Sequence, residues 1–187
     1  MFDTRDIENY WNLGRWRGIQ VWMHWSALLS FVWLYILLGS VVATLIGAAA
    51  LFFLFIVHEF GHVIALRRRG AYIDRITFFG IHGQTEHAPL RKQVDEILAA
   101  WSGVAAQAVV LILTLVARPF LTEIANPYFW MVAGPTMFVF INFNIFLMLV
   151  ALLPIGPFDG RVAWQVIPLV HENWRSAIER LLRYSQS

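Results

Sequence analysis

The sequence predicts an all-α membrane protein with about four transmembrane helices, a small cytoplasmic β-hairpin loop and a C-terminal amphipathic helix. Of its 187 residues 59% are hydrophobic and 14% are charged, whereas soluble domains carry about 25% charged residues. Four apolar stretches approach or exceed the roughly 20 residues that a helix needs to cross a bilayer. The chain contains no cysteine, which excludes disulfides and thiolate metal sites, and its net charge of +2 gives no indication of nucleic-acid binding.

The four apolar stretches are separated by turn signals and charged loops. Gly39 and Ser40 mark a tight turn between the first two stretches, and Pro154 ends the fourth. The stretches are Val21 to Leu38, Val41 to Leu66, Ile97 to Ala117, and Tyr128 to Leu153. We therefore expect a cytoplasmic N-terminal segment (1–20), a four-span core (21–159) and a cytoplasmic amphipathic tail (160–187).

Basic residues predict the orientation in the membrane. With four spans, Arg118 is the one residue among 14 lysines and arginines that falls in a loop on the opposite side from the others. Loops rich in lysine and arginine face the cytoplasm. Both termini are therefore predicted to be cytoplasmic.

Two segments outside the spans have patterns of their own. Ala71 to His87 alternates around Gly80 and Gly83, which predicts a β-hairpin. Its edge could pair with an unwound peptide segment by strand addition, or the hairpin could simply cover another part of the protein. The tail after Pro168 predicts an amphipathic helix that lies on the membrane surface or docks on its own protein. Its apolar face comprises Trp174, Ala177, Ile178, Leu181 and Leu182.

The chemistry concentrates in the second span, in the segment His-Glu-Phe-Gly-His at positions 58–62. Glu59 is the one formally charged side chain within the four spans, and a charge in hydrocarbon costs about 2.5 kcal/mol or more. His58 and His62 lie on the same helical face at i and i+4, so both can bind one metal ion. Glu59 is offset by one residue and can act as a general base, so the pattern predicts a metalloprotease site; the alternative is coincidence.

A third metal ligand is expected in the segment after the fourth span. Asp159 follows Pro154 and Pro157, which break the helix and let the chain fold back toward the depth of the histidines. Irregular backbone is tolerated at that depth if it is buried or lines a cavity. The alternative is an aspartate that caps a surface turn.

Together these residues resemble the site-2 protease family of intramembrane metalloproteases, in its small bacterial form without a PDZ or CBS domain. That family combines H-E-x-x-H with a later Asn-x-x-Pro-x-x-x-x-Asp-Gly motif. The resemblance covers about residues 17 to 165 of this chain. Three further segments match the family: His24-Trp25-Ser26, Ile76 to Gly83, and Gly103 to Gln107. The resemblance implies that His58, His62 and Asp159 bind one zinc ion per chain and that Glu59 activates water.

The resemblance also implies an activity and a location. The expected activity is that of a zinc metalloendopeptidase that hydrolyses a peptide bond within or next to a transmembrane segment of a membrane protein, in regulated intramembrane proteolysis. The expected partners are that substrate and the lipid bilayer, with no nucleic acid. The expected location is the bacterial inner membrane.

The chain departs from the family pattern at three positions. Ala151 replaces the asparagine before the proline, Arg161 replaces the second glycine after the aspartate, and Gln107 replaces an asparagine in the third span. Asn144 is retained one heptad before Ala151, on the same helical face. Asn144 and Gln107 are therefore candidates for substrate positioning or oxyanion stabilisation, and the alternative for Asn144 is a hydrogen bond to a neighbouring helix.

Three other functions compete with proteolysis. A catalytically silent, zinc-binding relative that binds membrane partners would explain Ala151 but not the intact Glu59. A metalloprotease with a glutamate as third ligand would need Glu172 or Glu179, both in the polar tail. A metal transporter would want ionisable groups along several spans. The Gly-x-x-x-Gln pattern of the third span permits close helix packing, including self-association into a homo-oligomer.

Overall fold

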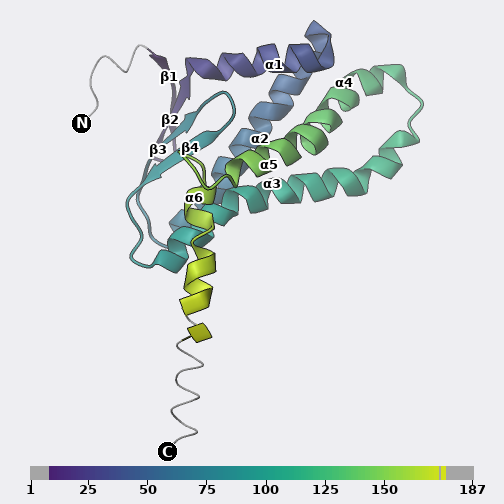
Figure 1. The fold of residues 1–187 in the computed structure, drawn as a ribbon. Helices are drawn as coiled ribbons and strands as arrows, with labels where there is room; N and C mark the ends of the chain where they lie inside the picture. Colours follow the sequence, from purple (N-terminus) through teal and green to yellow (C-terminus); the bar gives the residue numbers. More distant parts are fainter. Residues whose placement is uncertain (1–8, 173, 176–187) are drawn as a thin grey trace, which may run out of the picture.

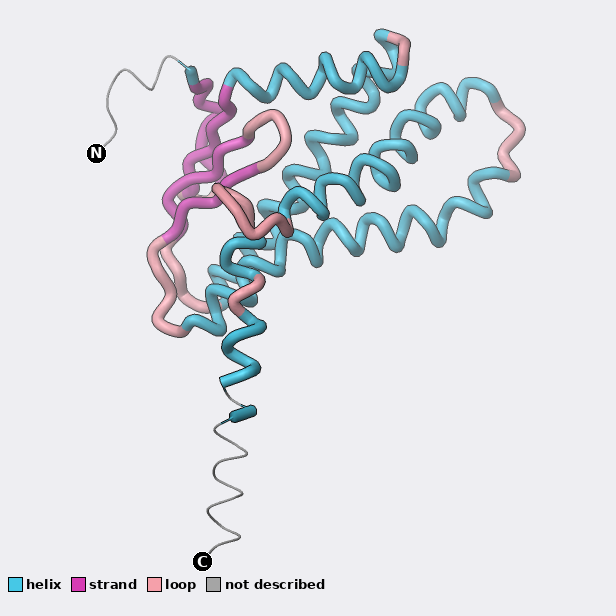
Figure 2. The backbone as a smooth tube through the Cα atoms, in the orientation of Figure 1, coloured by secondary structure: helices cyan, strands magenta, loops and turns pink. Residues whose placement is uncertain are grey.

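The computed structural model describes residues 9–172, 174 and 175. Long helices pack side by side, and a small sheet lies beside them at one end (Figures 1 and 2). The helices are α1 (Leu29–Leu38), α2 (Val41–Arg68), α3 (Gln93–Thr122), α4 (Pro127–Phe138), α5 (Asn144–Ala151) and α6 (Gly160–Ala163). A 3-10 turn (Trp25–Leu28) precedes α1, and a π-helical turn (Val139–Phe143) joins α4 to α5.

Three helical stretches of the described chain are long and apolar enough to cross a membrane: Val41–Arg68, Gln93–Thr122 and Pro127–Ala151. Many of their large apolar side chains are exposed on the outside of the bundle, as in the middle of α3, where Ile112, Leu113 and Val116 are each more than half exposed. Such a surface suits lipid rather than water. The architecture is that of an integral membrane protein.

The expectation of a spanning helix over Val21 to Leu38 is wrong. Val21 to His24 belongs to a β-strand, and α1 has only 10 residues. Even with the 3-10 turn before it, the apolar helical stretch Trp25–Leu38 is shorter than the roughly 20 residues that a helix needs to cross the hydrocarbon core. The prediction failed because a continuous apolar run does not distinguish a strand from a helix.

The expectation of an all-α fold is also wrong, because the chain contains a four-stranded mixed sheet of order β1-β2-β3-β4. Its strands are β1 (Tyr10–Trp16), β2 (Ile19–His24), β3 (Ile73–Phe78) and β4 (Gly83–His87). The outer pairs are antiparallel and the central pair, β2 and β3, is parallel. The expected hairpin over Ala71 to His87 is present as β3 and β4, but it forms only half of the sheet.

The other half of the sheet is an N-terminal hairpin that the polar composition of residues 1–20 concealed. Trp16 pairs with Ile19 across a two-residue turn in which Arg17 and Gly18 both have positive φ, at 48° and 88°. This is the requirement of a type I′ turn. The Arg67 guanidinium, at the end of α2, donates a 2.9 Å hydrogen bond to the Arg17 carbonyl oxygen. The basic N-terminal turn and the basic end of α2 therefore lie at the same end of the molecule.

Helix α2 is the central helix of the core. Its buried side chains, such as Leu51 and Leu54, pack among the sheet and the other helices, and Phe52 contacts Phe78 of β3 with ring centroids 5.2 Å apart. At Gly61 a β-carbon would overlap the backbone carbonyl of Ser102, so α2 and α3 approach closely at this level. Within the H-E-x-x-H segment, His58, Glu59 and His62 are buried, whereas Phe60 is exposed.

The C-terminal tail is described only in part. Residues 166–172 are helical, and Trp174 is 67% exposed. The remaining residues of the predicted apolar face (177, 178, 181 and 182) lie outside the described residues.

Candidate metal centre

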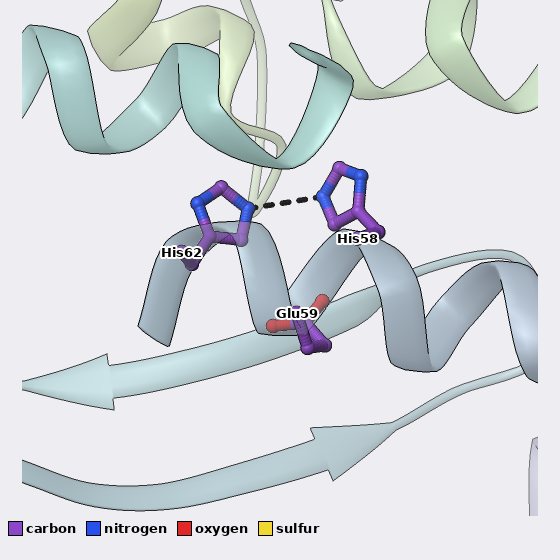
Figure 3. A group of neighbouring side chains, drawn as sticks. All are labelled: His58, Glu59 and His62. Atoms are coloured by element: carbon purple, nitrogen blue, oxygen red, sulfur yellow. Dashed lines mark hydrogen bonds between the residues drawn. The ribbon is translucent and has the colours of Figure 1, made fainter. Parts of the chain in front are cut away.

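The H-E-x-x-H segment lies in the second half of α2, with both histidines on the face toward α3 and the glutamate on the face toward the sheet (Figure 3). His58, Glu59 and His62 are 8%, 1% and 7% exposed. The two Nε2 atoms of the histidines are 3.0 Å apart, and one potential ligand atom from each of the three residues lies within 4.8 Å of the others. The helical spacing therefore brings two imidazole nitrogens to one point.

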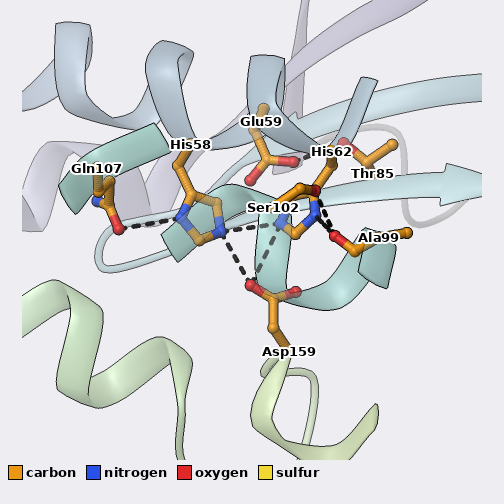
Figure 4. A network of polar contacts seen from close by, with 8 residues as sticks. All are labelled: His58, Glu59, His62, Thr85, Ala99, Ser102, Gln107 and Asp159. Atoms are coloured by element: carbon orange, nitrogen blue, oxygen red, sulfur yellow. Dashed lines mark hydrogen bonds and ion pairs between the residues drawn. The ribbon is translucent and has the colours of Figure 1, made fainter. Parts of the chain in front are cut away.

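Asp159 completes this group from a distant part of the chain (Figure 4). Its Oδ2 lies 3.0 Å from His58 Nε2 and 3.2 Å from His62 Nε2. The loop between α5 and α6 folds back tightly, since a β-carbon at Gly160 would overlap the Leu152 carbonyl. The Trp164 indole donates a 2.7 Å hydrogen bond to the same carbonyl oxygen and holds the loop in place.

These three side chains fit a divalent metal ion. Zinc bonds of about 2.0 to 2.1 Å in tetrahedral geometry separate the ligand atoms by roughly 3.3 Å, close to the distances between His58, His62 and Asp159. Two imidazoles and a carboxylate are a common donor set for zinc. A β-carbon at Gly103 would lie 2.5 Å from His62 Nε2 and 2.6 Å from His58 Nε2, so the glycine keeps the space beside both nitrogens open.

Both imidazole rings have a hydrogen-bond acceptor at their other nitrogen. His58 Nδ1 lies 3.0 Å from Gln107 Oε1, and His62 Nδ1 lies 2.8 Å from the Ala99 carbonyl oxygen. An acceptor at Nδ1 places the proton there and leaves the Nε2 lone pair free to bind metal. Both Nε2 atoms then have the electronic state that a ligand requires.

The charge of Asp159 is set by two opposing effects. Burial by itself would raise the pKa of this carboxyl group, but when no metal is bound the protonated forms of His58 and His62 donate hydrogen bonds and add positive charge, which hold the pKa well below its usual range. Asp159 is therefore ionised at neutral pH, as a metal ligand must be.

Glu59 is held from the opposite side by strand β4. Its Oε2 accepts a 2.5 Å hydrogen bond from the Thr85 hydroxyl. Its Oε1 is buried and has no hydrogen-bond partner among the described residues. At Gly83, two residues before Thr85 and on the same face of the strand, a β-carbon would overlap Glu59 Oε1. One carboxylate oxygen is thus hydrogen-bonded, and the other packs against Gly83 without a hydrogen-bond partner among the described residues.

A cavity of about 240 Å³ opens beside these residues. Glu59, His62 and Asp159 line one part of it, and His87, Glu96 and Arg161 line another. A single water needs roughly 10 to 15 Å³ on this measure, so the cavity can hold several waters or a short stretch of extended peptide. A second cavity of about 20 Å³ lies on the other side of His58, and its lining includes Ala151 and Gln107.

The structure separates Asn144 from the larger cavity. Asn144 is fully buried, and its Nδ2 donates a 3.0 Å hydrogen bond to the Gln107 backbone carbonyl oxygen. Gln107 in turn faces His58. Gln107 contacts His58, Asn144 contacts Gln107, and neither amide lines the 240 Å³ cavity.

The sequence did not predict three contributions to the site. Thr85 donates to Glu59, Gly103 leaves space beside the two Nε2 atoms, and the Ala99 carbonyl oxygen faces His62 Nδ1. The alternation of the hairpin indicated which residues of β4 share a face with Thr85. No sequence signal indicated that this face lies against Glu59.

Fold and site together define an integral membrane protein with a candidate metal centre of the H-E-x-x-H type. Among solved structures, the fold is similar to the site-2 protease from Methanocaldococcus jannaschii, with a TM-score of 0.63 and 20% sequence identity, over 84% of this chain and 71% of that chain. No model of a protein family matches the sequence, and no curated protein matches it. At this identity the similarity establishes a common fold.

Proposed function

We propose that the chain is an intramembrane zinc metalloprotease of the site-2 protease type. It hydrolyses a peptide bond within or next to a transmembrane segment of a membrane protein. The observation that carries this proposal is the convergence of His58, His62 and Asp159 on one point beside the buried carboxylate of Glu59. A buried carboxylate next to a metal-binding group is costly unless it has a chemical role.

The roles of the side chains follow from their geometry. A zinc ion held by His58, His62 and Asp159 would polarise a substrate carbonyl and increase the acidity of water beside it. Oε1 of Glu59 has no partner among the described residues and accepts the proton of the attacking water, while Thr85 orients the carboxylate through Oε2. The water oxygen bonds to the carbonyl carbon, the carbon–nitrogen bond breaks, and Glu59 passes the proton to the leaving amine.

The larger cavity supplies the route for water. Its lining contains the charged or ionisable side chains of His87, Glu96 and Arg161, at the end of the molecule where the basic residues gather. We propose that this end of the described chain, with the basic end of α2, faces the cytoplasmic side of a bacterial inner membrane. The cytoplasmic position of both termini depended on four spans, and with three it stays a prediction. Water then reaches Glu59 from the cytoplasm.

Strand β4 offers a way to hold an unwound substrate. It is an edge strand of the sheet, and Gly83, Thr85 and His87 line the larger cavity. An extended substrate segment would pair with this edge by strand addition. An extended peptide inhibitor should therefore lose potency when the amides facing β4 are N-methylated; equal inhibition by both peptides would favour a strand that only covers the site.

The proposal is tested by zinc content and by the glutamate variant. The purified wild type is expected to hold one zinc per chain and to cleave a transmembrane substrate in liposomes. Glu59→Gln should hold the same zinc but cleave nothing, and it should trap bound substrate. Turnover that survives in Glu59→Gln would remove Glu59 from the base role, and zinc uptake into the liposomes would support a transporter instead.

One observation favours a second candidate, a silent zinc-binding relative. Ala151 lines the small cavity beside His58 and Asp159, at the position where the resembled family has an asparagine amide. One zinc per chain without cleavage of any membrane substrate would support this candidate.

A further inference from the structure

We infer that Gln107 is a positioning residue of the metal centre, which fixes the tautomer and orientation of His58 through its side-chain carbonyl. The inference depends on the zinc site of the proposed function. It gives Gln107 a role different from oxyanion stabilisation, because its side-chain oxygen lies 3.0 Å from His58 Nδ1. Gln107 lines the small cavity beside His58 but not the larger cavity, in which the proposed function places the substrate.

The geometry of α3 matches that of α2. His58 and His62 are four residues apart, and their Nδ1 atoms face acceptors on Gln107 and Ala99, which are eight residues apart on one face of α3. Gly103 lies midway between these acceptors, beside both Nε2 atoms. Helix α2 therefore carries the two histidines. Opposite them, α3 carries the Ala99 carbonyl, the space at Gly103 and the Gln107 side chain, spaced four residues apart.

The two acceptors differ in what a mutation can remove. Ala99 contributes a backbone carbonyl, which every residue has. Gln107 contributes a side chain that is 2% exposed and that lies against a cavity of about 20 Å³, which has room for one water at most. Without Gln107 Oε1, the Nδ1–H of His58 would be buried with no acceptor, which costs about 1 to 3 kcal/mol. The proton would move to Nε2 or the ring would turn, and either change removes the ligand.

Asn144 supports the position of Gln107. It follows the π-helical turn Val139–Phe143, is completely buried, and donates to the Gln107 backbone carbonyl. This hydrogen bond joins α5 to α3 at the level of His58. Gly103 and Gln107 thus use the Gly-x-x-x-Gln pattern within the chain, against α2.

The test compares Gln107→Leu with Gln107→Glu in the full-length protein in detergent. Zinc affinity is measured by competition with a chelating dye, and the absorption spectrum of the cobalt-substituted protein reports ligand geometry. Gln107→Leu is expected to bind zinc roughly 10- to 100-fold more weakly, with an altered cobalt spectrum. Gln107→Glu retains an acceptor and is expected to keep the wild-type affinity and spectrum.

Gln93→Leu is the matched control, because Gln93 is an exposed glutamine at the start of the same helix. It should bind zinc as the wild type does. Wild-type affinity and spectrum in Gln107→Leu would overturn the inference and leave the zinc site standing, as would equal losses in Gln107→Leu and Gln107→Glu. Absence of zinc from the wild type itself would overturn the proposed function and the inference with it.

Discussion

The hydroxyl of Thr85 donates a 2.5 Å hydrogen bond to the carboxylate of Glu59, which joins an edge strand to the central helix of the bundle. The same carboxylate has its second oxygen buried with no partner among the described residues. A glutamate in this arrangement keeps one fixed orientation while retaining a free acceptor. The sheet therefore belongs to the chemistry of the site as well as to the fold.

Removing this hydrogen bond should slow catalysis without emptying the metal site. Thr85→Val keeps the shape of the side chain but loses the donor. A hydrogen bond to a charged group contributes about 1.5 to 3 kcal/mol, so we expect kcat to fall roughly 10- to 100-fold while zinc content stays unchanged. Thr85→Ser keeps the hydroxyl and should retain most of the activity. An undiminished kcat in Thr85→Val would show that Glu59 does not need this orientation.

Asp159→Ala should empty the metal site. Loss of a residue that is hydrogen-bonded to a metal ligand typically weakens zinc binding roughly 10- to 100-fold. Loss of the ligand Asp159 itself should weaken it more, because only two histidines remain. Zinc per chain is measured by elemental analysis after dialysis. Asp74→Ala is the control, since Asp74 is an exposed aspartate of β3. Full zinc content in Asp159→Ala would contradict the three-ligand site.

Gly103→Ala should abolish zinc binding by filling the space beside the two Nε2 atoms. The added methyl group would lie 2.5 to 2.6 Å from these side-chain atoms, and both rings are buried and hydrogen-bonded at Nδ1, so they have little freedom to move away. Gly134→Ala, also within a membrane helix but with nothing within 4 Å of the new carbon, should bind zinc normally. Circular dichroism checks that both variants fold, and a folded Gly103→Ala with full zinc would contradict this use of the space.

Ala151→Asn should raise kcat without changing zinc content. Ala151 lines the small cavity together with His58 and Asp159, so an amide there would lie beside the reacting group. One added donor can contribute up to about 10²- to 10³-fold when its geometry is right. Steady-state kinetics on one substrate would measure the gain. A fall in kcat would indicate that the small cavity cannot accept the larger side chain.

Part of the candidate site could be predicted because its residues are close in sequence. The i, i+4 spacing brings His58 and His62 to one face of any helix, and a carboxylate within an apolar run requires an explanation wherever the helix lies. Asp159 could be nominated from the two prolines before it, but its distance from the histidines depends on a folded-back loop. That loop depends on the close approach of Gly160 to the Leu152 carbonyl.

The fold was predicted less well, and the errors have a physical origin. Val21 to Leu38 is apolar apart from His24, Ser26 and Ser30, yet its first part pairs with β3 in a parallel ladder, and α1 and α2 lie between the two strands in the chain. Strand pairing between segments about 55 residues apart leaves no local periodicity to detect. The type I′ turn at Arg17 and Gly18 was hidden in a segment whose polar residues suggested an irregular terminus.

The sequence by itself determined that the helices face lipid and that His58, Glu59 and His62 form the candidate site, because the first follows from composition and the second from the spacing of residues along one helix. Tertiary structure alone decided how the site is completed. The distance from His58 to Asp159, the acceptors on α3 and the hydrogen bond from Thr85 to Glu59 all join segments that are separate in the chain. Such contacts depend on how helices and strands pack, and packing is a property of the whole fold rather than of any single segment.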